Sequence, residues 1–384
     1  MSVCVYCNND KPSTELCREH VIPRAIGGNL QPQNPFILNS VCKRCNHLSG
    51  VYIDGPFIKS WLTQNNRALN AKKCLNLKER CVLPLSYLGV SDDLNYEEKI
   101  CELWLGPTGD TIYHFHRAYP TDAHSSPMVG RPTYLRQEDI DPGFVFLFIR
   151  SNNPEWHPAI VYSVIEHFSW STLYLGNGPT PRGVPFSDIP PRLNHLLKVL
   201  KSMQGKHHKV SLVVGVDYGN RFLAKVALGI GSILLRDSYN TSHLANLLRQ
   251  FMWATSRKAR SSVLIRGTGF LGKHSENLGE YLAWPGGHSV IILNIDNSLY
   301  LTTCFHEVQT ATICISSEPV HWQGIIDDAG VIYVISPGLQ KYVGPKDLPT
   351  YLAHKTEGDF SDPDLKALED EMAEFRHPPP FDIQ

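Results

Sequence analysis

The amino-acid sequence predicts an α+β fold, in which a small metal-stapled domain at the N-terminus precedes a larger region of mixed helices and strands. The first observation is a pair of Cys-x-x-Cys motifs near the start of the chain. The second is that amphipathic helix-length segments and short strand-like segments both occur in the rest of the chain. The third is composition, because 384 residues that are 42% hydrophobic and 19% charged are typical of a globular protein with two or three domains.

Four cysteines near the N-terminus are spaced as zinc ligands. Cys4 with Cys7, and Cys42 with Cys45, form two pairs with a two-residue gap. This gap lets both sulfurs of each pair bind one ion at about 2.3 Å, and four thiolates leave no position for water, so the predicted Zn²⁺ is structural. Four unrelated reduced cysteines, or a redox-active pair, are the alternatives. A unit this small also needs a metal, because burial alone stabilises it poorly.

A set of polar residues lies between and beside these cysteine pairs. Glu19 and His20 begin a Glu-His-Val-Ile-Pro element, a Gly-Gly turn follows, Asn39 precedes the second cysteine pair and Asn46 follows it. Residues 4–58 in this arrangement resemble the HNH endonuclease family, in the subgroup with four zinc-binding cysteines. The resemblance implies a treble-clef, or ββα-metal, domain that hydrolyses phosphodiester bonds of DNA with the help of a catalytic Mg²⁺ or Mn²⁺ ion.

The resemblance also implies a role for each polar residue. In the family, the first His activates water, the residue beside it and one at the start of the last helix hold the metal, and the middle Asn orients the base. Carried over by position, these residues are His20, Glu19, Asn46 and Asn39. His47 is an alternative to Asn46, and Asn34 is an alternative to Asn39.

The chemistry of these residue types agrees with those roles. A His side chain has its pKa near neutral pH, so His20 is the candidate general base. Glu19 and Asn46 offer the hard oxygen ligands that Mg²⁺ prefers. Taken singly, a His after a Glu is more often a surface residue, and an Asn beside a Cys is more often a turn former. A non-catalytic zinc module that binds nucleic acid or a protein partner is therefore the second hypothesis.

Charge is concentrated at the N-terminus although the whole chain carries a net charge of only −1. Residues 1–75 contain nine Lys or Arg and four Asp or Glu, which leaves 27 basic and 33 acidic residues in the remainder. A local positive excess is expected where a phosphate backbone binds, although it also serves solubility. The predicted DNA contacts are Arg18, Arg24, Lys43 and Arg44.

We expect four regions along the chain: an HNH domain at 1–75, a β-rich connecting region at 76–142, an α+β recognition or regulatory domain at 143–354, and an acidic tail at 355–384.

Asp54 to Ala71 reads as one helix, and Ile100 to Leu105 with Thr111 to Phe115 reads as a hairpin. His114 and His116 share one face of the second hairpin strand. They are a possible second metal site, but the sequence shows no third ligand of matching spacing.

The remaining predictions concern the setting of the protein. Six further cysteines follow no paired pattern and no signal peptide or membrane-length apolar run is visible, so the predicted location is cytoplasmic. The resemblance implies DNA as partner and a place in bacterial restriction or antiphage defence with other proteins of such a system. One nuclease domain has one active site, so a double-strand break would need a homodimer or repeated nicking. The acidic tail is hypothesised to fold back on the basic nuclease domain as a mimic of DNA.

Overall fold

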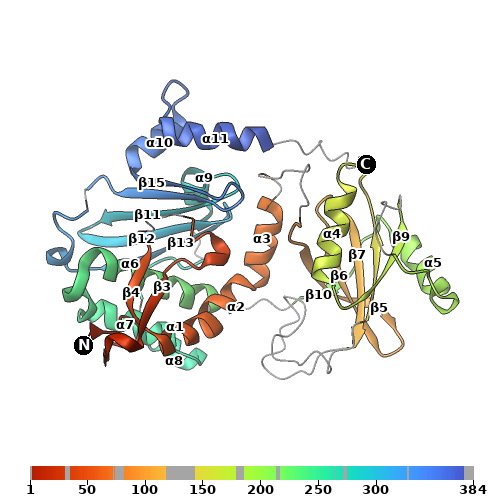
Figure 1. Ribbon diagram of the computed structural model, residues 1–384, viewed down its shortest axis with the longest axis horizontal. Helices are drawn as coiled ribbons and strands as arrows, with labels where there is room; N and C mark the ends of the chain where they lie inside the picture. The colour runs from red at the N-terminus through yellow and green to blue at the C-terminus, as the bar shows by residue number, and fades with distance from the viewer. Residues whose placement is uncertain are drawn as a thin grey trace. The chain divides into compact units, whose positions relative to one another are not determined.

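The computed structural model describes residues 2–30, 35–71, 73, 82–117, 143–178, 186–212, 217–263, 265–270, 275–326 and 328–375 (Figure 1). The chain divides into two compact units. Unit 1 comprises Met1–Ile58 and Val216–Glu374, and unit 2 comprises Lys59–Gly215 and Phe375–Gln384. The predicted boundaries after residues 75, 142 and 354 differ from this division. The reason is that the N-terminal domain shares one hydrophobic core with the segment that follows residue 216.

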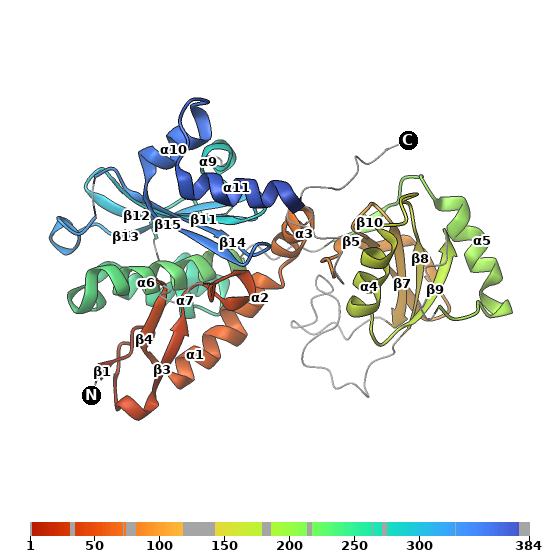
Figure 2. The same cartoon turned by 45° about the horizontal axis from the view of Figure 1, so that its top comes forward.

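The N-terminal domain, residues 2–58 of unit 1, is built on an antiparallel β-hairpin followed by short helices (Figure 2). Leu16 pairs with Cys42 and His20 pairs with Ile37, with a bulge between Cys17 and Glu19. The hairpin and the helix after the second cysteine pair agree with the prediction. The elements are β1 (Ser2–Val3), β2 (Asp10–Lys11), η1 (Ser13–Glu15), β3 (Leu16–His20), η2 (Arg24–Ile26), β4 (Ile37–Cys42), α1 (Lys43–Ser49), the π-helical turn η3 (Gly50–Asp54) and α2 (Gly55–Ile58).

The helix predicted from Asp54 to Ala71 is wrong as a single element. The structure has α2 in unit 1 and a separate helix, α3 (Trp61–Ala71), in unit 2. Ser60 explains the interruption, because its side chain accepts a hydrogen bond from the backbone N–H of Thr63 and caps the new helix. Trp61 then packs into a core of unit 2.

The rest of unit 1 is a five-stranded antiparallel sheet with helices, in the strand order β13-β12-β11-β14-β15. Asp296 and Asn297 have positive φ angles of 49° and 56°, so a tight turn joins β11 to β12. The elements are α6 (Asp217–Asn240), α7 (His243–Trp253), α8 (Arg257–Ser261), α9 (Ser275–Leu282), β11 (His288–Ile295), β12 (Ser298–Phe305), β13 (Gln309–Ser316), η7 (Pro319–His321), β14 (Val331–Ser336), β15 (Lys341–Asp347), α10 (Leu348–Thr356) and α11 (Pro363–Phe375).

One apolar core joins the N-terminal domain to α6 and to this sheet. The Phe57 ring of α2 stacks on the Phe222 ring of α6 with centroids 4.0 Å apart, and both rings also pack against Phe305 of β12. Val21, after β3, lies in the same core. Burying several aromatic rings at one junction stabilises it by several kcal/mol. The N-terminal domain is therefore an integral part of unit 1.

Unit 2 is a six-stranded sheet, in the strand order β10-β5-β6-β7-β8-β9, with a hydrophobic core on each face. Trp156 and Val161 lie in the core with α4, and Leu196 lies in the core with α5. The predicted hairpin is formed by β6 and β7. The elements are α3, β5 (Ser86–Tyr96), β6 (Lys99–Leu105), β7 (Thr111–Arg117), β8 (Phe144–Phe148), α4 (His157–His167), β9 (Thr172–Asn177), η6 (Pro191–Leu193), α5 (Asn194–Met203) and β10 (Val210–Ser211).

The acidic C-terminal segment does not lie against the basic residues of the N-terminal domain in the described range, which ends at Phe375. Lys346 of β15 pairs with Asp362 at 2.9 Å and with Asp364 at 2.6 Å, and Lys341 pairs with Glu371. α11 also buries Leu365, Leu368 and Met372. Asp362, Asp364 and Glu371 are thus paired within the C-terminal part of unit 1, and the tail hypothesis is corrected for these residues.

The predicted α+β class is confirmed, with mixed helix and sheet in both units. No helix among the described residues is long and apolar enough to cross a membrane.

Candidate active site and zinc site

The four predicted zinc ligands come together in the N-terminal domain. Their Sγ atoms all lie within 4.8 Å of one another. Cys4 and Cys7 lie in the turn between β1 and β2, whereas Cys42 ends β4 and Cys45 lies in α1. The backbone N–H of Cys42 donates to the Cys4 sulfur at 3.2 Å, a bond that favours the thiolate. Four convergent sulfurs, three of them buried, fit a structural Zn²⁺ ion and join the start of the chain to α1.

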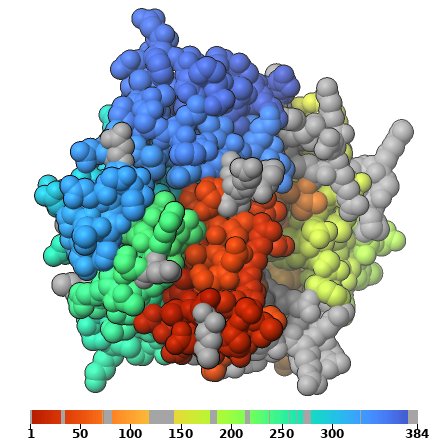
Figure 3. Space-filling model, turned by 60° about the vertical axis from the view of Figure 1, so that its left-hand side comes forward, coloured from red at the N-terminus to blue at the C-terminus, as the bar shows by residue number. Residues whose placement is uncertain are grey.

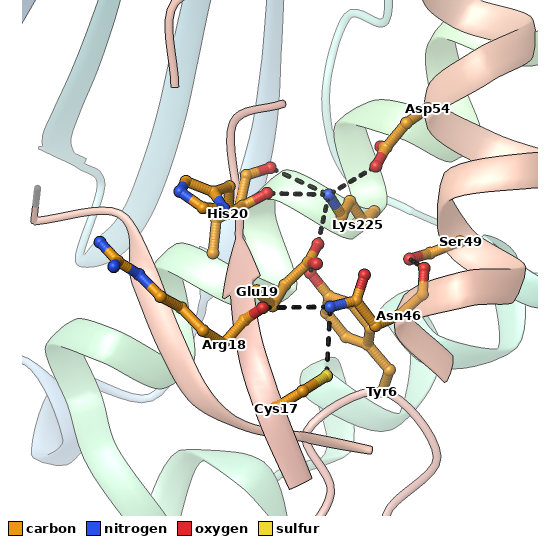
Figure 4. Close-up of polar contacts among 10 residues, drawn as sticks. Tyr6, Cys17, Arg18, Glu19, His20, Asn46, Ser49, Asp54 and Lys225 are labelled. Atoms are coloured by element: carbon orange, nitrogen blue, oxygen red, sulfur yellow. Dashed lines mark hydrogen bonds and ion pairs between the residues drawn. The ribbon is translucent and has the colours of Figure 1, made fainter. Parts of the chain in front are cut away.

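Glu19 is buried and forms an ion pair that the sequence prediction did not contain. Its Oε1 atom lies 2.7 Å from the Lys225 ammonium and accepts a hydrogen bond from the Tyr6 hydroxyl at 3.2 Å. Lys225 is fully buried on α6, and it also lies 3.0 Å from an oxygen of Asp54. The backbone carbonyls of His20 and Val21 accept from the same ammonium at 3.3 and 3.2 Å (Figure 4).

The ammonium is the centre of this arrangement because it is fully buried and lies within 3.3 Å of four oxygens. Burial alone lowers the pKa of a lysine, but Asp54 and Glu19 outweigh it and raise the pKa of Lys225. Burial raises the pKa of Asp54 to about 6, and Lys225 opposes that shift. Burial and the neighbouring Glu19 raise the pKa of Tyr6, so its hydroxyl stays a donor. Glu19 is therefore held in one position from two sides.

Asn46, the second predicted metal ligand, lies beside Glu19. Its amide nitrogen donates to the Cys17 sulfur at 3.2 Å and to the Arg18 carbonyl at 3.1 Å. These two bonds fix the amide, and Figure 4 shows its side chain between α1 and β3, next to that of Glu19. His47, the alternative, is exposed at the neighbouring position of α1, whereas Asn46 is half-buried. The structure therefore favours Asn46 over His47 as the partner of Glu19.

His20 lies on the opposite face of β3 from Glu19, as successive residues of a strand do. Its ring points away from the Lys225 ammonium in Figure 4 and is partly exposed. Because His20 pairs with Ile37, Asn39 two positions further along β4 projects from the same face as His20. Asn39 is exposed and has no hydrogen bond among the described residues. Asn34, its alternative, lies outside those residues.

The electrostatic surroundings keep His20 neutral. Partial burial, and then the charges of Arg24 and Arg18, lower the pKa of His20, and Glu19 offsets only part of that effect. Arg18, Arg24, Lys43 and Arg44 are all exposed. Figure 3 shows the N-terminal domain at the molecular surface, bordered by other segments of unit 1. The predicted base and the predicted phosphate contacts are thus accessible from solvent.

Sequence reasoning missed Lys225, Asp54 and Tyr6. Lys225 carried a usable signal, because it is a lone charge in the apolar run from Phe222 to Leu228. A lysine in such a position on a helix is either exposed by chance or buried with an anion. Nothing in the sequence, however, indicates that its partner lies about 200 residues earlier.

A β-hairpin, a following helix and a four-cysteine cluster that joins them form a small ββα domain, and the cluster fits a metal ion. Residues 4–62 match the sequence model of a protein family described as HNH endonuclease. The match agrees with the resemblance seen in the sequence, and it concerns the N-terminal segment, which is an HNH-type domain. No curated protein and no solved structure matches the chain.

Proposed function

We propose that the protein is a metal-dependent endonuclease that hydrolyses DNA phosphodiester bonds in its HNH domain. The observation that carries the proposal is that Glu19 and Asn46, from β3 and α1, lie side by side and are each fixed by two hydrogen-bonding partners. A module that only binds DNA or protein has no need of a buried carboxylate beside an amide at this place. Nuclease chemistry needs both, because hard oxygens hold Mg²⁺ or Mn²⁺.

The residues present fit such a cation. Lys225 and Tyr6 both contact Oε1 of Glu19, so Oε2 is the oxygen that can bind a metal. The amide nitrogen of Asn46 is engaged, which leaves its Oδ1 atom for the metal. The Oδ1 atom of Asp54 is buried and has no hydrogen-bond partner among the described residues. When bound, the ion would neutralise the scissile phosphate and stabilise the departing 3′-oxygen.

His20 is the proposed general base, and because its ring leaves β3 on the opposite face from Glu19, the proposal requires the scissile phosphate to lie at the end of the strand, between the two side chains. Its lowered pKa keeps the imidazole neutral near pH 7, so a ring nitrogen can take the proton of the attacking water. Asn39, on the same strand face, is proposed to orient that ring. Arg18, Arg24, Lys43 and Arg44 are exposed and are proposed to bind the phosphates on either side of the cut.

The setting we propose is cytoplasmic, in bacterial restriction or antiphage defence, with other proteins of such a system as possible partners. Its support is the resemblance of the HNH segment to enzymes of that kind. One HNH domain provides one cutting centre, so a monomer nicks and a homodimer can cut both strands. Light scattering after size-exclusion chromatography measures which of these forms is present.

A plasmid-nicking assay tests the function. With Mg²⁺ or Mn²⁺, wild type is expected to convert supercoiled plasmid to nicked or linear DNA. His20→Ala is expected to bind DNA equally well and to cut about 10²- to 10⁴-fold more slowly, the usual contribution of a general base. His47→Ala is the matched control, because His47 is an exposed His of the same domain. Cutting by His20→Ala at the wild-type rate would refute the mechanism, and wild type that binds DNA without cutting would favour the non-catalytic zinc module.

A further inference from the structure

A second group of ligand-type side chains lies in unit 2, apart from anything the HNH domain uses. Glu102 of β6 pairs directly opposite His114 of β7, and His116 lies two residues further along the same strand. The three side chains therefore share one face of the sheet. All three residues are buried, with Glu102 completely so. Each offers one ligand atom, and these atoms lie within 4.8 Å of one another.

The distances within the group are long for hydrogen bonds and suitable for ligands of one ion. The Glu102 Oε2 atom lies 3.4 Å from His114 Nδ1 and 3.4 Å from His116 Nε2. A charged His–carboxylate hydrogen bond is usually about 2.7–2.9 Å long. Two ligands bound to one ion at about 2.1 Å in a tetrahedron lie roughly 3.4 Å apart. The two imidazole rings are stacked with centroids 4.5 Å apart, so both nitrogens can face the same carboxylate.

The far side of each ring is bonded in the way that metal-binding histidines require. His116 Nδ1 lies 2.7 Å from the Arg117 carbonyl, which only accepts, so this nitrogen carries a proton. In a neutral ring, Nε2 then has a lone pair directed at Glu102. His114 Nε2 lies 3.1 Å from the Ser171 hydroxyl, which can hold the other ring in the matching tautomer. Such outer hydrogen bonds fix the tautomer of metal-binding histidines.

Glu102 itself needs a cation. Its ion pairs are with His114 and His116 alone, among the described residues, and its Oε1 atom is buried without any hydrogen-bond partner there. Leaving a carboxylate in such a place costs several kcal/mol unless a positive charge compensates it. A protonated histidine would supply one charge, yet both histidines face the same oxygen, Oε2, and Oε1 would stay without a hydrogen-bond partner. A metal ion satisfies both lone-pair nitrogens and the carboxylate together.

We propose that Glu102, His114 and His116 bind a divalent transition-metal ion, Zn²⁺ or Fe²⁺, in unit 2. Two imidazoles and one carboxylate are a ligand set that suits these ions and leaves at least one coordination position open. The site supplies the third ligand that spacing along the sequence did not reveal. It is independent of the nuclease proposal, because it shares no residue with the HNH domain.

Metal analysis of the full-length protein tests the proposal. Purified protein is stripped with a chelator, reloaded with Zn²⁺ or, without oxygen, with Fe²⁺, freed of excess metal, and measured by mass spectrometry. Glu102→Gln and His116→Gln are each expected to hold one metal ion per chain fewer than wild type. His195→Gln, an exposed His of unit 2, is the matched control and is expected to hold the wild-type amount. The two reloading arms distinguish zinc from iron.

Equal metal content in wild type and in a folded Glu102→Gln variant would overturn the proposal. If that variant does not fold, X-ray absorption of zinc-loaded wild type decides. Bound zinc with a mixture of sulfur and nitrogen or oxygen neighbours is the expected result. Zinc with sulfur neighbours only, together with iron-loaded protein that retains no Fe²⁺, would show that the four cysteines hold all the metal.

Discussion

Glu19 in unit 1 and Glu102 in unit 2 are both buried carboxylates, but their charges are balanced differently. Glu19 contacts Lys225, whose ammonium is a permanent part of the chain. Glu102 contacts two imidazoles at 3.4 Å and has an oxygen with no hydrogen-bond partner among the described residues. A cation supplied by the protein is always present, whereas one supplied from solution depends on its concentration. The charge of Glu19 should thus be balanced without added metal, whereas the stability of unit 2 should depend on added transition metal.

The largest loss of stability is expected from removing the Lys225 ammonium. Lys225→Met keeps the volume of the side chain but leaves Glu19 and Asp54 buried without a positive partner. Breaking one side of a buried ion pair costs about 3–5 kcal/mol, and here two carboxylates lose the same partner. Urea unfolding of the zinc-loaded protein, followed by a probe in unit 1, measures the loss. Lys225→Arg is the control that keeps the charge.

The triple variant Lys225→Met with Glu19→Gln and Asp54→Asn checks the cause. Removing the two carboxyl charges as well should restore much of the stability, because no unpaired charge remains. If the triple variant is as unstable as Lys225→Met alone, then packing of the lysine stem, and not charge, holds α6 to the HNH domain.

The effect of Glu102→Gln on the free energy of unfolding should change sign when metal is added. This change of sign distinguishes Glu102 from Glu19. In metal-free protein, Glu102→Gln removes a poorly compensated charge, so the free energy of unfolding of unit 2 should stay equal or rise by about 1 kcal/mol. With metal at about 100 times its dissociation constant, wild type gains about 2.7 kcal/mol and the variant does not. Thermal unfolding with and without Zn²⁺ measures both arms. A destabilised Glu102→Gln variant in both conditions would mean that a protonated histidine is the partner.

A smaller effect is expected from the second partner of Glu19. Tyr6→Phe removes the hydroxyl that donates to Oε1 and leaves the buried ring in place. A hydrogen bond to a charged group contributes about 1.5–3 kcal/mol, and Lys225 remains, so we expect a loss of about 1.5 kcal/mol. Nicking should slow only modestly. A loss of activity as large as that of His20→Ala would show that Tyr6 takes part in the chemistry.

The sequence predicted those parts of the structure that depend on short spacing. The spacing of the cysteine pairs predicts the zinc site. The motif places Glu19 and Asn46 together because Glu19 lies in the hairpin and Asn46 lies in the helix that the cysteine cluster joins to it. Lys225 was beyond reach because its contact joins residues about 200 positions apart. The third ligand in unit 2 was missed for another reason. A hairpin at 100–115 was predicted, but the five-residue connection leaves its register open, and only the observed register sets Glu102 opposite His114.

The predicted domain boundaries differ from the two units for a similar reason. A chain that leaves unit 1 after Ile58 and returns at Val216 shows no break in composition at either point. The apolar pattern from Asp54 to Ala71 reads as one helix and so does not show where the chain leaves unit 1. In the structure α2 ends at Ile58 and Ser60 caps a new helix, α3. Hydrophobic periodicity predicts which residues are buried, but it does not predict which of two hydrophobic cores they belong to.

The smallest predicted effect concerns the pH dependence of DNA cutting. It tests whether the partly exposed His20 or the buried Asp54 determines the acid limb of that dependence. The pKa of His20 is lowered, so its neutral, basic form persists below pH 6.5 and the acid limb of the kcat/KM profile should lie below that value. A bound divalent ion adds positive charge and shifts the pKa in the same direction. Arg24→Gln removes one of the charges responsible and should move the limb upward by a fraction of a pH unit, whereas Arg24→Lys should not. If the acid limb does not move in Arg24→Gln, then a group other than His20 determines the limb. Asp54 is the first candidate, because burial raises its pKa to about 6.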